Sequence, residues 1–451
     1  MLTFNGSILT KDSAWLNTQA TLPEGTIRFR FWNNYTPTSG TASSNTSKFG
    51  VWTAVDASQG IWDWTCNDRT SWMSAFENRL TQANMGNRYC RILEANFGSV
   101  TSARQMFKYC TRLESAENVH LTNVTDAYAM FNGASNMRRA EIYDTSKLTT
   151  SAYMFAYIYS LTSVTLFDTS HVTDFGSMFY TCYGLTSVPA FNTSNGTKFD
   201  YFLGSCTSLT SIPLFDTSKA TDLHGMLSMC TKITSVPLFD TSKAENMSDM
   251  LSFCERLTSI PNFDTSKCTR MSSFVRGTAI TTFPLLDTSK VTFMTYMFAA
   301  CSRLSSIPQL NTSSVTSMSG MFYDCTALTS VPLLDTSNVT DMGNMFHGCT
   351  ALTTLPLLDT SSVVDMQYMC YNCAYLTSIP LFDTSLCSNM DLAFSDCGRV
   401  ETGALDLYNQ ASSQTVPPLS HNATFNNCGF RTVSGAAELA QIPSSWGGTM
   451  A

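Results

Sequence analysis

The stretch DTSNVTDMGNMFHGCTALTTLPLL (residues 335–358) decides the fold of this chain, because it is one unit of an internal repeat. Its first three letters, Asp-Thr-Ser, recur in steps of 24 residues, apart from one interval of 23 that has lost a residue around 276–279. The marker residues are Asp144, Asp168, Asp216, Asp240, Asp264, Asp287, Asp335, Asp359 and Asp383, with Asn192 and Asn311 in phase and His120 and Asn96 as looser equivalents. The period predicts a solenoid of about thirteen coils, which must stack because no coil can bury its apolar edge alone.

Each part of the repeat predicts a local structure. The Asp-Thr-Ser start is typical of a turn, in which short oxygen-bearing side chains bond nearby backbone N–H groups. The apolar residues that follow are spaced three and four apart, as on one face of a short helix or helical turn: Val339, Met342, Met345, Phe346 and Cys349. Leu352 and Leu355 then indicate a short extended segment that ends at Pro356. We therefore expect an α/β repeat solenoid, a right-handed rod of the leucine-rich-repeat type.

Two segments of the repeat resemble a known family. FDTSKATDLHGMLSMCTKITSVPLFDTS (215–242) and LLDTSNVTDMGNMFHGCTALTTLPLLDTS (333–361) resemble the repeats of the BspA-like leucine-rich-repeat family, bacterial surface proteins also met in gut phages. The resemblance covers about 96–397. Both ends of the chain, TIRFRFWNNYTPT with VWTAVDASQGIWDWT at the start and GAAELAQIPSSWGG at the finish, resemble uncharacterised repeat proteins of gut phages. The resemblance implies a surface protein and lends no settled activity.

The composition changes at both ends of the repeat, which predicts three domains: 1–80, 81–397 and 398–451. The first holds six of the seven tryptophans, Trp15, Trp32, Trp52, Trp62, Trp64 and Trp72. Its segment 26–31 alternates like a half-buried strand, and 36–47 reads as a loop. This β-rich domain either caps the first coil, or attaches the solenoid to something larger, or carries an aromatic glycan site. The last domain predicts a cap with a helix around 404–411 and with Trp446 over the open edge of the last coil.

Charge and hydropathy exclude several classes of partner. Only 13% of the residues are charged, the formal net charge is -8 and no basic run occurs, so neither nucleic acid nor an anionic membrane is an expected partner. No stretch approaches the roughly 18 apolar residues of a membrane-spanning helix. The first residues, MLTFNGSILTKDSAWLN, lack a basic region followed by an apolar one, so they do not predict a secretory signal.

The cysteines follow the repeat. Ten occupy one repeat position: Cys110, Cys182, Cys206, Cys230, Cys254, Cys301, Cys325, Cys349, Cys373 and Cys397. This position closes the apolar face, so we expect buried, reduced thiols. Cys370 and Cys373 form a C-x-x-C pair, and with Cys387 and Cys397 they offer four sulfurs that could hold zinc or a disulfide. Since Cys370 and Cys387 stand in ordinary apolar slots, core packing is the favoured reading.

The remaining polar residues give little chemistry. Equally spaced aspartates could bind calcium, yet Asn192 and Asn311 replace two of them, which favours turn formation. The five histidines stand at different phases of the repeat, and no known catalytic motif is present: His120, His171, His224, His347 and His421. We therefore predict no enzyme, no catalytic residue, no metal site and no cofactor.

A column of prolines marks the candidate binding surface. It consists of Pro189, Pro213, Pro237, Pro261, Pro284, Pro308, Pro332, Pro356 and Pro380. Proline cannot donate to a β-ladder, so the sheet should be narrow, three or four residues per strand. The next position tolerates Ala190, Asn262 and Gln309, which indicates that it is the more exposed of the two apolar positions after each proline. The predicted contact stripe is Pro213, Leu214, Pro237, Leu238, Pro284, Leu285, Pro332, Leu333, Pro356, Leu357, Pro380 and Leu381, with partial burial within the rod as the alternative.

Long repetitive faces suit recognition, so we predict a non-enzymatic surface recognition or adhesion protein. The phage-like ends favour a virion component, a tail or head fibre, exposed on the virion surface or extracellular. Its partners would be a glycan or protein of the host surface, and other virion proteins through residues 1–80. Self-association into a homo-oligomer stays open. A bacterial cell-surface adhesin is the second hypothesis, and an intracellular scaffold is the third.

Overall fold

The computed structural model describes residues 21–32, 36–37, 50–66, 74–77, 79–80 and 89–448. The chain divides into two compact units, Met1–Gly196 and Thr197–Ala451, and each is described by itself. Trp15, Trp72 and most of the loop predicted at 36–47 lie outside the described residues.

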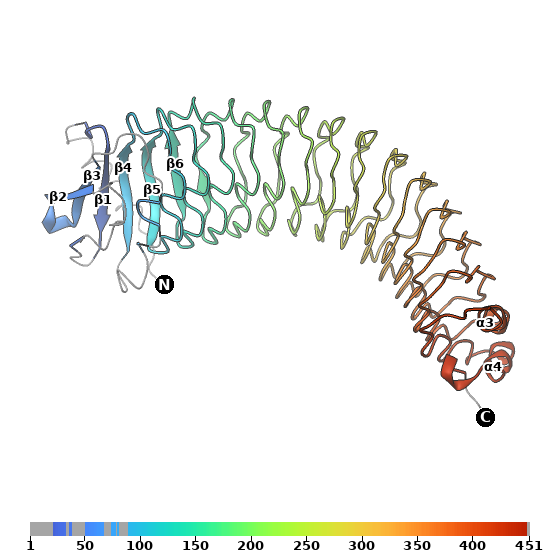
Figure 1. The fold of residues 1–451 in the computed structure, drawn as a ribbon. Coiled ribbons are helices and arrows are strands. Elements are labelled where there is room, and N and C mark those ends of the chain that lie inside the picture. The colour runs from blue at the N-terminus through green and yellow to red at the C-terminus, as the bar shows by residue number, and fades with distance from the viewer. Residues whose placement is uncertain are drawn as a thin grey trace. The chain divides into compact units, whose positions relative to one another are not determined.

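The first unit contains one seven-stranded sheet, in the order β2-β3-β1-β4-β5-β6-β7 (Figure 1). Its strands are β1 Thr26–Phe31, β2 Gly50–Asp56, β3 Ile61–Cys66, β4 Cys90–Asn96, β5 Leu113–His120, β6 Arg139–Tyr143 and β7 Ser163–Val164, with a 3-10 turn η2 at Ala57–Gln59. β1 pairs antiparallel with β3 and β4, whereas β4 to β7 pair in parallel, one strand per coil. The sheet therefore continues across residue 80, where the sequence predicted a domain boundary.

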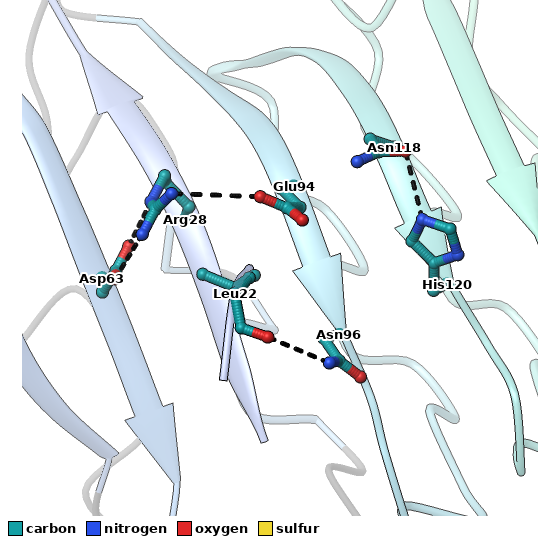
Figure 2. Close-up of polar contacts among 7 residues, drawn as sticks. All are labelled: Leu22, Arg28, Asp63, Glu94, Asn96, Asn118 and His120. Atoms are coloured by element: carbon teal, nitrogen blue, oxygen red, sulfur yellow. Dashed lines mark hydrogen bonds and ion pairs between the residues drawn. The ribbon is translucent and has the colours of Figure 1, made fainter. Parts of the chain in front are cut away.

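Strand β1 shows the alternation that the sequence predicted. Ile27 and Phe29 are fully buried on one face. Arg28 points to the other face, where its Nε lies 2.8 Å from Asp63 Oδ1 and its Nη1 lies 3.9 Å from Glu94 Oε2 (Figure 2). The Arg28 side chain is only 5% exposed, so this strand is more buried than predicted. The reason is that β1 is an inner strand, whose neighbours on both sides supply carboxylates that cover the guanidinium.

The helical face predicted within each coil is wrong. Between residues 89 and 403, all of them described, no helix forms. In the coil 335–358, Asn344 and Gly348 adopt the left-handed conformation, with φ of 58° and 70°. Each lies in a tight turn: the Met345 N–H donates to the Met342 carbonyl (3.1 Å), and the Cys349 N–H donates to the Phe346 carbonyl (3.0 Å). A residue with positive φ ends a right-handed helix, so the α component of the predicted fold class is absent from the coils.

The remaining amide groups of this segment bind the next coil. The N–H groups of Asn344, Phe346 and Gly348 donate to carbonyls 23 residues ahead, at 2.8, 2.7 and 2.8 Å. Every second N–H of this segment thus donates to the next coil, whereas in an α-helix each N–H donates to a carbonyl of the same helix. Paired turns of four residues nevertheless place apolar side chains three and four apart, and this spacing imitated a helix in the sequence. What remains of the predicted fold class is a repeat solenoid.

The prolines mark the point at which the sheet ends. In the first unit the Thr165 N–H donates to the Ala140 carbonyl (3.0 Å), next to the last parallel strand β7. In the following coil the same position is Pro189, which has no N–H to give. Among described residues 197–448 no strand forms at all, so the predicted strands of three or four residues are wrong there. Successive coils keep the single parallel bridges that also occur in the first unit, such as Asp341 with Asp365 and Asp126 with Thr150.

Stacked phenylalanines fill the core of each unit. In the first unit neighbouring rings lie 5.3–5.8 Å apart along Phe76, Phe107, Phe131, Phe155 and Phe179. In the second unit Phe298, Phe322 and Phe346 repeat the arrangement at 5.5 Å. All eight are fully buried. Beyond the burial of apolar area, such aromatic pairs contribute about 0.5–1.5 kcal/mol each.

The C-terminal segment contains the helices of the described residues. They are α3 Ala404–Ser412 and α4 Val433–Leu439, followed by a 3-10 turn η3 at Ser444–Trp446 (Figure 1). The helix predicted at 404–411 is confirmed. Trp446 stacks on His421 at 4.1 Å and lies 6.4 Å from Phe425, so its predicted place against the last coil is also confirmed. Neither described helix has the length and apolarity that crossing a membrane requires.

Candidate binding surface

The proline column forms a tight turn that pushes one leucine outward. In the representative coil the Leu358 N–H donates to the Pro356 carbonyl (2.9 Å), which closes a γ-turn with Leu357 at its centre. The central side chain points to solvent and the next one points to the core. Leu357 is 64% exposed, whereas Leu358 is 2% exposed.

The same hydrogen bond is formed to the carbonyls of Pro237 and Pro380, and the exposed leucine after the proline recurs more widely in the second unit. The exposed leucines are Leu214, Leu238, Leu285, Leu333, Leu357 and Leu381, each between 54% and 68% exposed. The prolines before them are half-buried: Pro213, Pro237, Pro284, Pro332, Pro356 and Pro380. We call these twelve residues the leucine stripe. The leucines are exposed as predicted, the prolines are partly buried, and the role of the stripe in binding stays a prediction.

Two coils of the second unit interrupt the leucine stripe with polar residues. Asn262 and Gln309 take the place of the leucine, and both are exposed. The Gln309 side-chain amide donates to the Leu333 carbonyl at 2.7 Å, so this glutamine ties its coil to the next. The stripe is therefore apolar in separate blocks rather than throughout.

Exposed aspartates lie on one flank of the stripe, two residues after each leucine. Asp359 Oδ1 accepts the Ser361 N–H (3.0 Å) and the Ser361 hydroxyl (2.6 Å), and these bonds hold the pKa of Asp359 below its usual 3.8. Asn311 accepts the N–H of Ser313 in the same way at 3.1 Å. The predicted turn role of this column is thus confirmed, and it explains why Asp and Asn are interchangeable there.

The threonine of the Asp-Thr-Ser marker has a role that the sequence did not reveal. Thr336 is 1% exposed, and its Oγ1 donates to the Asp359 carbonyl of the next coil at 2.7 Å. The equivalent threonines do the same along the chain, for example Thr217 to the carbonyl of Asp240 (2.7 Å). A periodic buried Thr was the available signal, since a hydroxyl is rarely buried without a partner.

The cysteine column is buried, as predicted, and also ties coils together. Cys349 Sγ donates to the Phe322 carbonyl of the preceding coil at 3.1 Å, and Cys325 Sγ donates to that of Phe298 at 3.0 Å. Burial raises the pKa of the thiols of Cys110 and Cys230 to about 12. A protonated thiol is a donor that fits an apolar slot, which accounts for cysteine at this position.

The four sulfurs near the C-x-x-C pair are also core residues. Cys370 is fully buried in the slot that phenylalanine occupies elsewhere, and Cys397 Sγ donates to its carbonyl at 3.0 Å. Cys387 Sγ donates to the Asn389 carbonyl at 3.4 Å. All sixteen cysteines are buried, and none of them forms a disulfide bond. Within the described ranges, no group of three or more His, Cys, Asp or Glu side chains is placed to hold a metal ion.

The histidines lie apart from one another. His120 contacts Asp144 (Nδ1 to Oδ2, 2.6 Å) and Asn118 (Nε2 to Oδ1, 3.1 Å; Figure 2). His347 lies between the rings of Tyr323 (4.4 Å) and Tyr371 (5.0 Å). The other histidines also make local contacts, such as His171, whose Nδ1 lies 3.1 Å from the Ser170 hydroxyl on an exposed turn.

The structure also gathers tyrosines that the sequence analysis passed over. Tyr109, Tyr157, Tyr159 and Tyr183 are exposed on the paired turns of the first unit. Rings of neighbouring coils touch: Tyr159 stacks on Tyr183 at 5.4 Å, and Tyr157 meets Tyr180 edge-on at 5.4 Å. Tyrosine recurs in the sequence near the left-handed positions. The helical spacing of the same segment does not show that these tyrosines lie side by side.

Comparison with known proteins gives one assignable match. No curated protein matches the chain. Among solved structures, a leucine-rich repeat protein from Eubacterium ventriosum is 17% identical with a TM-score of 0.37, over 62% of this chain and 78% of that one. The TLR13-ssRNA13 complex is 12% identical with a TM-score of 0.20, over 72% of this chain and 53% of that one. The plant peptide hormone receptor RGFR1 in complex with RGF2 is 12% identical with a TM-score of 0.20, over 67% of this chain and 61% of that one.

Structural similarities with TM-scores this low support no conclusion about this chain. The match to a family model is more informative. Its overlapping matches are 58–143, 101–212, 159–259, 185–282, 230–332, 256–355, 279–378 and 355–428. They follow the repeat through most of its length and cover well over half of the 451 residues. The chain therefore belongs to the repeat family described as Mycoplasma protein of unknown function, DUF285.

Proposed function

We propose that this protein is a non-enzymatic recognition or adhesion protein and that the leucine stripe is its contact surface. The observation that carries the proposal is the repeated exposure of leucine, 54–68%, directly after the proline on six coils of the second unit. A side chain that served only packing would be buried at most of these positions. Exposed apolar residues that recur in register mark interaction sites in soluble proteins.

The stripe has the energetics of a contact surface. Burying one leucine side chain against a partner contributes about 1.5–3 kcal/mol. The γ-turn and the proline before each leucine already fix the backbone, so little conformational entropy is lost on binding. Several such leucines on successive coils add their contributions without any single deep pocket.

For the setting, we propose a virion component, a tail or head fibre that contacts a glycan or protein on the host surface. The phage-like segments at the two ends support this setting, and residues 1–80 would then join the protein to other virion components. Two further settings are kept as candidates for the same surface, a bacterial cell-surface adhesin and an intracellular scaffold. Detection of the protein in purified particles supports the first setting, and its absence from them contradicts it.

The contact surface is tested by binding to intact host cells. We expect the triple variant Leu333→Asp, Leu357→Asp and Leu381→Asp to lose binding, because three charges would have to be desolvated in the interface. The matched control places three Asp substitutions on exposed polar residues of the same coils but away from the stripe: Thr326→Asp, Asn338→Asp and Asn372→Asp. Binding that survives in the stripe variant as in the control would make the coils a spacer and move recognition to the ends.

A further inference from the structure

The one coil that is a residue short creates a recess. In a full coil the N–H of Leu257 donates to the Cys254 carbonyl (2.9 Å), so the two residues between them form the projecting tip of a turn. Those two residues are Glu255 and Arg256, and both are exposed. On the other side of the short coil, Ser302 and Arg303 form the equivalent tip.

The short coil lacks this tip. Thr278 stands where the column has cysteine, Ile280 stands where it has leucine, and only Ala279 lies between them. The Thr278 hydroxyl turns inward and donates to the Val275 carbonyl at 2.8 Å. Because one residue is missing, the short coil has no projecting tip. A gap is therefore left between the tips of the two neighbouring coils.

The gap is a recess of about 420 Å³. Most of its polar lining comes from the neighbouring coils: Glu255, Arg256, Thr258, Ser302 and Arg303. Thr278 of the short coil also lines the recess. Its floor includes Ala279 of the short coil. This volume is within the range of small-molecule sites, about 300–1,000 Å³.

The coil that forms the floor is held in place from both sides. The guanidinium carbon of Arg276 lies 5.1 Å from the ring centre of Phe253 and 5.1 Å from that of Tyr296, on the preceding and following coils. Cation–π contacts with two aromatic rings hold this arginine side chain in one position. The recess thus belongs to the packed structure and does not depend on a loop.

The lining selects one class of ligand. Two guanidinium groups flank the recess of a protein whose formal net charge is -8, and they favour an anionic group. The Glu255 carboxylate and the hydroxyls of Thr258 and Ser302 offer partners for neutral hydroxyl groups. No aromatic side chain lines the recess, so a flat apolar ligand has nothing to stack on. A polyhydroxylated anion meets all of these conditions.

We propose that this recess binds an acidic saccharide. The carboxylate or sulfate of the sugar pairs with Arg256 and Arg303, and its ring hydroxyls bond to Glu255, Thr258 and Ser302. The proposal rests on the recognition role proposed above, since it names a ligand class for such a protein. It uses a different site from the leucine stripe.

The test titrates the full chain with a tetrasaccharide of alternating glucuronic acid and N-acetylglucosamine, followed by calorimetry. We expect the double variant Arg256→Ala and Arg303→Ala to weaken binding by about tenfold or more, as the loss of charge-assisted hydrogen bonds implies. Lys232→Ala is the matched control, because Lys232 is exposed at the same repeat position but does not line the recess. A second variant inserts one serine between Ala279 and Ile280, which restores the missing tip and should abolish binding while both arginines remain.

The anion and sugar parts of the proposal are tested separately. The carboxyl-reduced tetrasaccharide should fail to bind, and a sulfated neutral tetrasaccharide should bind, whereas inorganic sulfate alone should bind far more weakly than either acidic sugar. Equal affinity for the acid and its reduced form, or unchanged binding after the serine insertion, would overturn the proposal. These titrations use no cells, so their failure is distinct from a failure of the leucine stripe in cell binding. Variants that no longer melt like the parent protein are replaced by Arg256→Gln and Arg303→Gln.

Discussion

The coils at 90–164 and the coils of the second unit share one repeat and differ in how they are joined. In the first set, β4 to β7 pair as parallel strands. Single bridges at another position of the repeat join neighbouring coils in both sets, but in the second set prolines occupy the segment that was a strand. One position separates the two: Thr165 donates its N–H to the Ala140 carbonyl, whereas Pro213 has no N–H.

The two sets also present different surfaces. The sheet of the first set carries ion pairs on its outer side, such as Arg139 with Glu117 (3.2 Å) and Arg91 with Glu114 (3.5 Å). The second set presents the leucine stripe. Proline ends the sheet but does not by itself expose the leucine, because Leu166, which follows Thr165 and not a proline, is also 61% exposed. The exposure therefore belongs to this position of the repeat, and the second set repeats a leucine there on more coils.

Exchanging proline and threonine between the two sets should have the largest effect. Thr165→Pro removes the donor to the buried Ala140 carbonyl, and an unpaired buried carbonyl costs about 1–3 kcal/mol. Pro356→Thr adds an N–H where the chain already turns toward solvent, so its effect on the free energy of unfolding should stay below about 0.5 kcal/mol. Urea denaturation followed by circular dichroism measures both.

Thr165→Val is the control for the first substitution, since it keeps the N–H and loses the hydroxyl that contacts Ile142. A loss of stability in Thr165→Val as large as that in Thr165→Pro would assign the effect to the hydroxyl. Equal losses in Thr165→Pro and Pro356→Thr would contradict the difference between the two sets.

The paired turns, in contrast, should respond alike in both sets. Gln105 in the first unit and Asn344 in the second occupy the same repeat position, with φ of 55° and 58°. A β-branched residue is disfavoured there, so Gln105→Val and Asn344→Val should each cost about 1–2 kcal/mol. Gln105→Gly and Asn344→Gly should be close to neutral, because glycine adopts this φ freely. Thermal melting of the four variants decides whether the left-handed position limits stability equally in both units.

Lowering the pH should change the free energy of unfolding in opposite directions in the two sets. This is the smallest of the expected effects. Hydrogen bonds from Ser218 and Ser242 lower the pKa of Asp216 and Asp240 below the usual 3.8, so their stabilisation is complete above about pH 3.8 and is lost as the pH falls through the lowered values. Burial raises the pKa of Glu94 above its usual 4.5, so its contribution is complete below pH 4.5 and is lost as the pH rises through the raised value.

Because the aspartates are exposed, each should contribute less than about 0.5 kcal/mol. The measurement is the melting temperature between pH 3 and pH 7 for Asp240→Asn and Glu94→Gln. Asp240→Asn should flatten the acid side of the profile while leaving stability at pH 7 nearly unchanged, as Asn311 serves the same turn elsewhere. A steeper acid response in Asp240→Asn would show that the serine bonds do not act as described.

The sequence predicted the repeat, the buried cysteines, the turn role of Asp-Thr-Ser and the exposure of Leu357, because each depends on a residue's own chemistry at a fixed period. The prediction failed where a helix and a pair of turns give the same spacing of apolar residues. Met342, Met345 and Cys349 have helical spacing, and the structure uses paired turns instead. The pattern of side chains does not show whether a backbone N–H donates within its own coil, as in a helix, or to the next coil, as in the paired turns.

The candidate sites divide in the same way. Period and composition alone indicated a repeat solenoid with an interrupted apolar stripe, since the proline recurs on nine successive coils and leucine follows it on six of them. The recess beside Arg256 and Arg303 was visible in the sequence only as a missing residue. The tertiary structure decided what that deletion does, because the side chains that line the gap come from two neighbouring coils and meet only when the coils stack.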